Sequence, residues 1–291
     1  MLQSIEHVMS LMEKHSYITD RALPTTIFLA EKLQKPIFLE GEAGVGKTEV
    51  AKVMAKILQT RLIRLQCYEG LDVNTALYEW NYSKQMLYIR LGESTGESKE
   101  VLEKNIFSEE FLIRRPLLEA ITAEQEPPPV LLIDEIDRCD EEFEAFLLEV
   151  LSDFQITIPE IGTIRARHRP FVVLTSNRTR EIHDALKRRC LYLWIDYPSW
   201  EKEYRIVREK VPGIEETLAQ KICTFMQQMR QINFQKKPGI AETLDWAAAL
   251  LHLRKHELDA ETIIETIGCV LKYREDIEKF KSEHLSTMLE G

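Results

Sequence analysis

One short glycine-containing stretch constrains the fold of this chain more than any other part of the sequence. It matches the pattern G-x-x-x-x-G-K-[ST], and its residues are Gly41, Glu42, Ala43, Gly44, Val45, Gly46, Lys47 and Thr48. Glycines in this pattern let backbone N–H groups fold around phosphate oxygens, and the helix that follows adds its positive N-terminus. Lys47 is expected to reach the β- and γ-phosphates of a nucleotide, and the Thr48 hydroxyl to bind Mg²⁺. An ordinary glycine turn is the alternative, but the apolar run before the stretch and the helical pattern after it favour a nucleotide-binding loop.

A pair of carboxylates follows a continuous apolar run further along the chain. Asp134 and Glu135 come directly after Val130–Ile133, so we expect them at the carboxyl end of a buried strand, where α/β sheets bind ligands. An aspartate there can hold Mg²⁺ together with Thr48, and a glutamate beside it can polarise a water for in-line attack on the γ-phosphate. The pair therefore favours hydrolysis over transfer of the phosphate to a substrate. The alternative is a strand that runs into an acidic turn.

A polar residue closes another apolar strand. Asn177 ends the run Val172–Asn177, where its amide is placed to orient the attacking water. Taken alone, Ser176 and Asn177 would more simply cap the next turn. Because Asn177 follows the glycine-containing stretch and the two carboxylates in order, we predict that it belongs to the same site.

Apolar strands alternate with helical segments as far as Tyr197. Such continuous apolar runs predict an α/β fold, an αβα sandwich with a parallel central sheet covered by helices on both faces. Residues 199–291 show only helical periodicity. We therefore predict a nucleotide-binding α/β domain over residues 1–197 and a small all-helical domain over residues 198–291.

Four segments are predicted from local texture alone. Residues 4–34 are expected to be helical. Period-two runs predict one β-hairpin over residues 78–91 and a second over residues 155–167, while polar residues 93–106 are expected to form a loop. Residues 107–125 are predicted as one helix. Aromatic side chains on the first hairpin would either bind a partner or pack across the strands; they are Tyr78, Trp80, Tyr82 and Tyr88.

The charge balance and the cysteines narrow the function further. Asp and Glu number 48 against 38 Lys and Arg, a net charge of −10, which argues against a nucleic-acid partner. No apolar stretch reaches the ~20 residues that a membrane span needs. The cysteines number five and lack any C-x-x-C spacing, so we predict neither a disulfide framework nor a zinc site and expect a cytoplasmic protein.

The ordered set of motifs resembles the AAA+ ATPases. The glycine-containing stretch resembles their Walker A loop, Asp134 and Glu135 their Walker B carboxylates, and Asn177 their sensor-1 residue. The trailing helical segment looks like their lid domain. The resemblance implies that ATP and Mg²⁺ are the cofactors, and that the chain forms a homo-oligomeric ring, expected to be a hexamer, with nucleotide between its subunits.

The resemblance also gives a role to a basic cluster before the last apolar strand. In AAA+ rings an arginine near the end of a helix reaches the γ-phosphate of the neighbouring subunit, and it can contribute about 10³ to 10⁵ in rate. Arg189 stands at that place, with Arg188 as the alternate. The alternative is a helix C-terminus with favourable cations worth ~0.3 to 1 kcal/mol each. Arg114 and Arg115 could also face a neighbour, but we interpret them as surface charges.

Within the AAA+ ATPases the chain looks most like the MoxR branch. The two predicted hairpins stand where that branch has its helix-2 insert and its hairpin before sensor 1. The phrases PIFLEGEAGVGKTEVAKVMA, RPLLEAI and KPGIAETLDWA look closest to the group that accompanies molybdenum-containing carbon monoxide dehydrogenases. The chain departs from the family at sensor 2, because Ala241 falls where an arginine is common; Lys236 or Lys237 could substitute.

The resemblance therefore implies a ring that hydrolyses ATP in order to remodel or activate a protein client. A molybdenum-containing carbon monoxide dehydrogenase is the candidate client. A DNA-directed AAA+ motor or loader is the alternative, against which stand the acidic balance and a C-terminal segment fully used by the lid. A small-molecule phosphotransferase and a nucleotide-binding module without hydrolysis are further alternatives.

Overall fold

The centre of the protein is a five-stranded sheet in which every neighbouring pair of strands is parallel, with the order β2-β5-β8-β1-β9. The computed structural model describes residues 2–289. The strands are β1 (Ile37–Glu40), β2 (Leu62–Gln66), β5 (Val130–Asp134), β8 (Phe171–Ser176) and β9 (Leu191–Trp194). This arrangement confirms the predicted α/β fold with a parallel central sheet.

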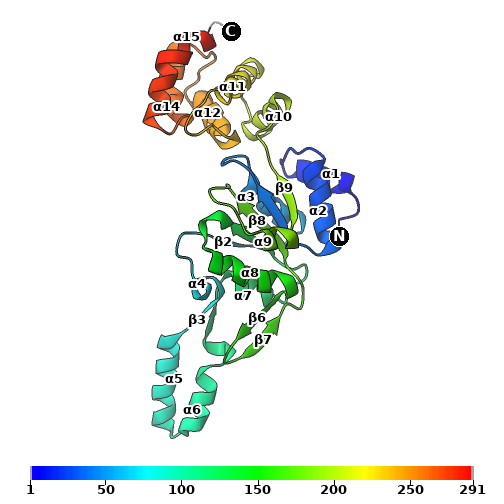
Figure 1. The fold of residues 1–291 in the computed structure, drawn as a ribbon, viewed down its shortest axis with the longest axis vertical. Coiled ribbons are helices and arrows are strands. Elements are labelled where there is room, and N and C mark those ends of the chain that lie inside the picture. The colour runs from blue at the N-terminus through cyan, green and yellow to red at the C-terminus, as the bar shows by residue number, and fades with distance from the viewer. Residues whose placement is uncertain (1, 290–291) are drawn as a thin grey trace.

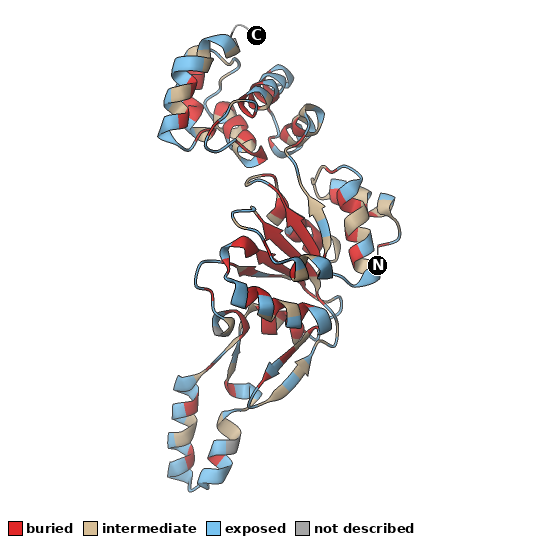
Figure 2. Cartoon of the chain, in the orientation of Figure 1, coloured by how far each residue is buried: buried red, intermediate tan, exposed pale blue. Residues whose placement is uncertain are grey.

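The sheet is buried on both faces, which explains its continuous apolar strands. Along β5, Leu131 and Ile133 lie in the core on one face, whereas Val130 and Leu132 lie in the core on the other. The second face is covered by α1 (Ile5–Lys14), α2 (Ala22–Leu33) and α3 (Lys47–Ile57). The first is covered by α4 (Val73–Leu77), α7 (Pro116–Ile121), α8 (Glu141–Asp153) and α9 (Asp184–Arg189). Figure 2 shows the buried strands between these helices.

As far as residue 289, the last that the structure describes, only helices and turns follow β9, and they surround a hydrophobic core of their own. Trp246, Phe225 and Phe280 pack together at its centre. The elements of this C-terminal helical region are α10 (Trp200–Lys210), α11 (Glu216–Met229), α12 (Ile240–His252), α13 (Ala260–Thr266), a 3₁₀ turn (Ile267–Cys269), α14 (Arg274–Lys279), a π-helical turn (Phe280–His284) and α15 (Leu285–Leu289). Figure 1 shows the region at one end of the molecule, above the edge of the sheet where the strands end.

The hairpin predicted over residues 78–91 is wrong. The strand β3 (Tyr78–Trp80) pairs instead with β4 (Leu112–Arg114), and two helices, α5 (Tyr82–Thr95) and α6 (Lys99–Ile106), form an arm between them. The side chain of Asn81 starts α5 by accepting a hydrogen bond from the Lys84 N–H at 3.0 Å. Gln85 then holds the two helices together by donating to the Ile106 carbonyl at 2.5 Å. These contacts stabilise the pair of helices α5 and α6 in place of the β-hairpin that the short alternating pattern predicted (Figure 1).

The neighbouring predictions fail for related reasons. The loop predicted over residues 93–106 contains α6, and the single helix predicted over residues 107–125 is a 3₁₀ turn (Glu109–Phe111), then β4, then α7. Three of the aromatic side chains pack within the base of the arm: Tyr78 lies 6.0 Å from Trp80, Trp80 5.4 Å from Phe107, and Tyr88 5.3 Å from Phe111, centroid to centroid. Among the four predicted aromatic residues, Tyr82 alone is exposed.

Other local predictions hold. Residues 155–167 contain the antiparallel hairpin β6 (Gln155–Ile158) and β7 (Gly162–Arg165). Arg114 and Arg115 form ion pairs within the chain, with Glu109 at 3.2 Å and Glu79 at 2.5 Å, as expected of surface charges. Within residues 2–289 no helix is long and apolar enough to cross a membrane.

Candidate active site

The glycine-containing stretch forms a tight loop between β1 and α3. Gly44 and Gly46 have φ angles of 80° and 97°, which residues other than glycine rarely adopt. Gly41 is required for space, because a Cβ atom there would lie 2.2 Å from the Ile195 carbonyl oxygen. The N–H groups of Val45 and Gly46 donate to no other group in the described part of the chain. The loop therefore offers unpaired donors at the N-terminus of a helix, a favourable place for phosphate.

Lys47 is buried inside this loop. Its Nζ donates to the carbonyl oxygens of Gly41 and Glu42 at 2.7 and 2.6 Å. Burial lowers the pKa of the Lys47 ammonium to about 8, against the opposing effect of Asp137, Glu42, Asp134 and Glu135. An ammonium that is held within the loop and short of hydration is suited to bind a phosphate anion.

Thr48 and Asp134 meet across the junction of α3 and β5. The Thr48 hydroxyl donates to Asp134 Oδ1 at 2.9 Å, and the Thr175 hydroxyl donates to the same oxygen at 2.6 Å. Asp134 Oδ2 accepts from Arg64 Nε at 3.0 Å and from Nη2 at 2.5 Å. A hydroxyl and a carboxylate side by side are hard oxygen ligands, so these two residues fit Mg²⁺.

Glu135 lies at the end of β5, next to Asp134. Its backbone is left-handed, with φ 57°, and its N–H donates to the Thr175 hydroxyl at 2.9 Å. The carboxylate accepts from Asn177 Nδ2 at 3.3 Å and from Gln66 Nε2 at 3.2 Å. Strain of this kind, of order 1–3 kcal/mol, persists where neighbours fix the residue and is common in active sites. The contacts leave the side chain one-third exposed, so water can reach it.

Asn177 is held in place through its backbone. Its N–H donates to Asp137 Oδ1 at 3.2 Å, and Asp137 Oδ2 accepts from the N–H and hydroxyl of Thr179 at 2.9 and 2.7 Å. Asp137 is itself buried. The loop after β8 is thus fastened to the loop after β5, which brings the Asn177 amide to Glu135.

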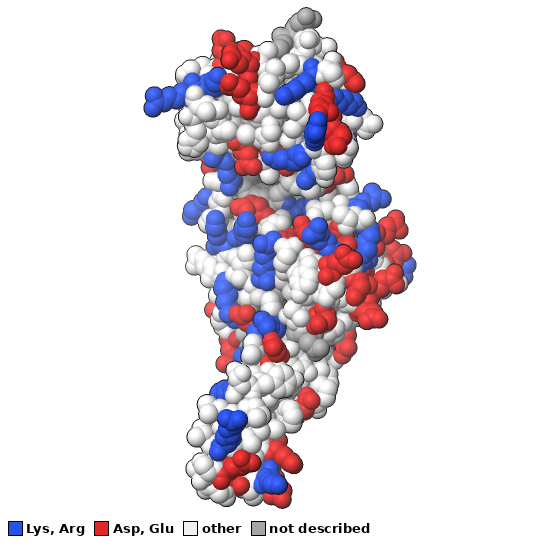
Figure 3. All heavy atoms as spheres, turned by 90° about the vertical axis from the view of Figure 1, so that its left-hand side faces the viewer, with Lys and Arg blue, Asp and Glu red and all other residues white. Residues whose placement is uncertain are grey.

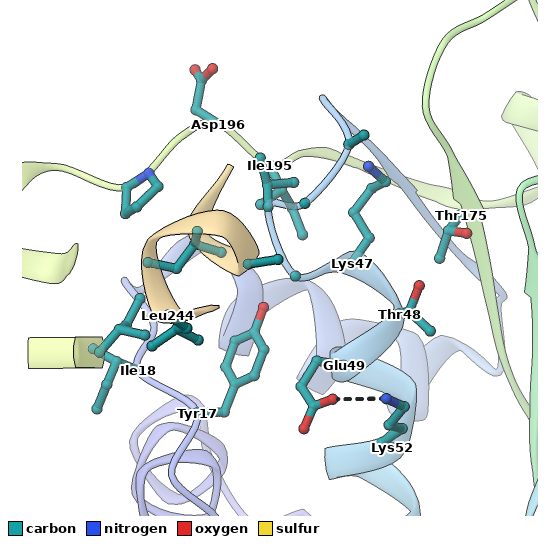
Figure 4. Close-up of a pocket in the computed structure, with 18 of the residues that line it drawn as sticks. Tyr17, Ile18, Lys47, Thr48, Glu49, Lys52, Thr175, Ile195, Asp196 and Leu244 are labelled. Atoms are coloured by element: carbon teal, nitrogen blue, oxygen red, sulfur yellow. Dashed lines mark ion pairs between the residues drawn. The ribbon is translucent and has the colours of Figure 1, made fainter. Parts of the chain in front are cut away.

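A cavity of about 500 Å³ connects these groups. Lys47, Thr48, Asp134, Glu135 and Asn177 line one part of it. The cavity is also lined by the charged side chains of Lys202 and Lys210 on α10 and by apolar or aromatic side chains, which are Tyr17, Ile18, Ile195, Ile206, Ile240 and Leu244. Figure 4 shows Lys47, Thr48 and Thr175 on one side and Tyr17, Ile18 and Leu244 on the other. A polar end with unpaired N–H donors and an apolar end match the phosphates and the base of a nucleotide.

Several residues that line the cavity or contact its carboxylates were not predicted. Tyr17 and Ile18 lie between α1 and α2 and carry no local motif. Thr175 and Gln66 reach the carboxylates only because β8 and β2 flank β5. Arg64 gave one signal, because it is a charged residue within an apolar strand.

Two predicted groups lie outside the catalytic part of the cavity. Arg189, at the end of α9, is exposed and donates to Ser152 Oγ at 2.5 Å and to the Ala185 carbonyl at 3.2 Å. It does not line the cavity. Ala241 does line it, whereas Lys236 and Lys237 are exposed and do not. The lysines of the C-terminal helical region that line the cavity are instead Lys202 and Lys210 on α10.

The comparison with protein families agrees with this geometry. A family model described as the AAA domain (dynein-related subfamily) matches residues 36–190, more than half of the chain. The chain therefore belongs to this family, a branch of the AAA+ ATPases, which bind and hydrolyse ATP.

The chain is also similar to uncharacterized staphylococcal proteins and, in fold, to solved structures. An uncharacterized protein of Staphylococcus epidermidis is 25% identical over 229 residues, 76% of this chain and 78% of the relative. One of Staphylococcus haemolyticus is 24% identical over 250 residues, 83% and 86% of the two chains. The Thermotoga maritima RuvB Holliday junction branch migration motor has a TM-score of 0.47 at 18% identity, covering 89% of this chain and 67% of that one. A Cytophaga hutchinsonii protein solved as a candidate ATPase has a TM-score of 0.49 at 14% identity, covering 98% and 93%.

Proposed function

We propose that this protein is an ATP hydrolase in which Glu135 activates the attacking water and Asn177 orients it. The observation that carries the proposal is the meeting of Glu135 with Asn177, 3.3 Å apart, beside the Thr48–Asp134 pair at 2.9 Å. Magnesium bound by Thr48 and Asp134 would neutralise phosphate charge. The residues 41–48 would hold the phosphates, with Lys47 as their cation.

We further propose that the active form is a homo-oligomeric ring, with six copies expected. Arg189 is the group that a neighbouring subunit would supply, because it is exposed and lies outside its own cavity. In this arrangement the α/β domain spans residues 1–197 and the C-terminal helices, residues 198–291, act as the lid. Ala241 replaces the usual sensor-2 arginine, so the lid would act without that cation.

The proposed client is a protein. Resemblance to the MoxR branch supports this class of client, and the phrases shared with the carbon monoxide dehydrogenase accessory group support a molybdenum-containing enzyme as its substrate. The correction of the insert from a hairpin to a pair of helices removes one of the features that supported the branch. The phrases and the hairpin over residues 155–165 remain. The five free cysteines fit a cytoplasmic protein.

The substitution Glu135→Gln tests the hydrolase. Loss of the general base should lower kcat by about 10² to 10⁴, while the affinity for ATP stays within about twofold because Lys47 and the loop are unchanged. Glu142→Gln, an exposed acid on α8, is the matched control and should leave both quantities unaltered. Full turnover by Glu135→Gln would contradict the assignment of the base.

A DNA motor or loader is the competing function, and nucleic acid separates the two. Lys and Arg side chains on the face shown in Figure 3 are interspersed with Asp and Glu, so no purely basic surface stands out on it. ATP turnover should not change when duplex or single-stranded DNA is added at low salt. Strong stimulation by DNA would contradict the protein client while leaving the hydrolase intact.

A further inference from the structure

The C-terminal helical region touches the phosphate loop directly, through main-chain atoms. The Ala241 N–H, in the first turn of α12, donates to the Gly44 carbonyl oxygen at 3.2 Å. Gly239, two residues earlier, lies against the same loop. The hydrogen bond joins main-chain atoms of the two elements, and Ala241 Cβ and the Glu242 carboxylate lie on the same side of Gly44.

Gly239 is required for space rather than for conformation. Its φ of −86° is open to any residue. A Cβ atom at this position would, however, lie 2.8 Å from the Ala43 carbonyl oxygen and 2.9 Å from Gly44 Cα. Both neighbours are backbone atoms, which cannot move aside as a flexible side chain would. Any larger residue at position 239 must therefore displace either the loop or the helical region.

The carbonyl that α12 holds belongs to a peptide unit with a second function. In a planar trans peptide the C=O and the N–H point in opposite directions, and the one cis bond among the described residues is Glu126–Pro127. The Gly44 carbonyl points to Ala241, so the Val45 N–H points away from α12. That N–H has no partner among the described residues. One end of the peptide is thus fixed by the helical region, and the other end is free to bind an anion.

The segment that contacts the loop, residues 238–241, is held in place by a buried ion pair on its other side. Arg230 donates to the Pro238 carbonyl at 2.9 Å, next to Gly239, and makes two hydrogen bonds of 2.6 Å to Glu203. Thr243 on α12 donates to the same Glu203 carboxylate at 2.6 Å. The segment is therefore fixed to α10 and α11 of the same helical region.

We propose that Gly239 is a positioning residue that lets the C-terminal helical region grip the Gly44–Val45 peptide, so that phosphate binding and docking of this region stabilise each other. The proposal rests on nucleotide binding by the cavity, and not on hydrolysis. When the Val45 N–H points toward a phosphate, the Gly44 carbonyl points toward the Ala241 N–H, so phosphate binding favours docking of the helical region. Docking raises the affinity for phosphate by the same factor. The coupling needs no cationic side chain, which suits a chain that carries Ala241.

Amide hydrogen exchange of residues 239–243 tests the coupling, with inorganic pyrophosphate as the probe. Pyrophosphate carries the phosphates but no base, so it isolates the loop from Ile240 and Leu244 at the apolar end of the cavity. We expect pyrophosphate to slow the exchange of this segment at least fivefold in the unaltered protein. The proposal would be overturned if saturating pyrophosphate gave no protection, including the case in which ADP protects the segment and pyrophosphate does not.

Two glycine substitutions supply the matched comparison. Gly239→Ala should weaken pyrophosphate and ADP binding about 5- to 150-fold and abolish the protection. Gly268→Ala lies in the same helical region, where a Cβ atom meets nothing within 4 Å, and should behave as the unaltered protein. Unchanged binding and protection in Gly239→Ala would overturn the proposal. Equal thermal melting of the two variants excludes misfolding as the cause of a difference.

A second pair of variants, both at position 241, tests the hydrogen bond itself and leaves Gly239 unchanged. Ala241→Pro replaces the N–H by a ring carbon, which removes the hydrogen bond and crowds the Gly44 carbonyl, while Ala241→Ser keeps the N–H. We expect the proline variant alone to lose protection, and equal protection in both would overturn the proposal. The proposed hydrolase activity can fail independently of this coupling. If pyrophosphate slows the amide exchange of residues 239–243 but the protein does not turn over ATP, the proposed function is contradicted and the coupling stands.

Discussion

Lys47 and Arg189 are two cations that we assign to the same nucleotide, yet their surroundings are opposite. Lys47 is 6% exposed and is bound by two loop carbonyls within the cavity. Arg189 is exposed, is bound to Ser152 on α8, and does not line the cavity. A buried cation serves its own subunit, whereas an exposed one can serve another. The difference supports our proposal that one subunit binds the nucleotide and that a second supplies Arg189.

The largest expected effect comes from removing the exposed cation. Arg189→Ala should lower kcat by about 10³ to 10⁵, because the transition-state charge loses its partner. The Kd for ATP should change less than about threefold, since the groups of the cavity are intact. Steady-state turnover and equilibrium binding of a fluorescent ATP analogue measure the two quantities. Arg188→Ala, its exposed neighbour on α9, is the comparison, because a loss of turnover there in place of Arg189→Ala would assign the role to the alternate.

Mixing two inactive variants sharpens this test. A site between a Glu135→Gln subunit that supplies Arg189 and an Arg189→Ala subunit that supplies Glu135 contains both groups. Mixed oligomers should therefore recover part of the lost turnover, while each variant alone stays inactive. If an arginine acted within its own subunit, mixing would restore nothing. Full ATP turnover by a demonstrably monomeric preparation would also remove the need for a neighbour.

The buried cation should act on binding first. Lys47→Ala removes charge-assisted hydrogen bonds to phosphate, worth about 1.5 to 3 kcal/mol, so ATP affinity should fall about 10- to 100-fold. Calorimetric titration with a slowly hydrolysed ATP analogue measures this loss. Lys52→Ala is the matched control, because Lys52 also lines the cavity but is half exposed and paired with Glu49 at 3.2 Å. Equal affinity in both variants would contradict the role given to Lys47.

The phosphate loop and the strand ends could be predicted because their signals are local. The glycines at 44 and 46 predict a turn with left-handed backbone, and the apolar runs before Asp134 and Asn177 predict strands that are buried on both faces. Parallel strands bring their carboxyl ends to one edge, so these polar residues had to meet. The roles of these residues in turnover stay predictions, which the substitutions above test.

The insert could not be predicted, because its structure depends on distant partners. The alternation around Ser83 is short, and α5 is fixed by the Asn81 cap and by the contact of Gln85 with Ile106. Likewise, no pattern in the sequence announces that Tyr17 and Ile18 border the cavity, or that Gly239 packs on Gly44. These contacts join segments far apart in the chain, and only the assembled fold brings them together.

Arg64 is intermediate between the two cations, and its removal should have the smallest effect. Its side chain is 49% exposed, yet it donates twice to Oδ2 of Asp134, which is 3% exposed. Oδ1 keeps its hydrogen bonds from Thr48 and Thr175 when Arg64 is lost. Arg64→Gln should therefore lower kcat by less than about tenfold, a fraction of the 1.5 to 3 kcal/mol that a hydrogen bond to a charged group can contribute.

The magnesium dependence of turnover distinguishes this role from a general loss of stability. If Arg64 positions Asp134, the Mg²⁺ concentration at half-maximal turnover should change in Arg64→Gln, while the Kd for nucleotide measured without Mg²⁺ stays the same. Arg61→Gln removes a cation of similar exposure, 45%, that pairs with Glu119 instead, and should change neither quantity. A loss as large as that of Arg189→Ala would show that Asp134 depends on Arg64 and that exposure alone does not rank these cations.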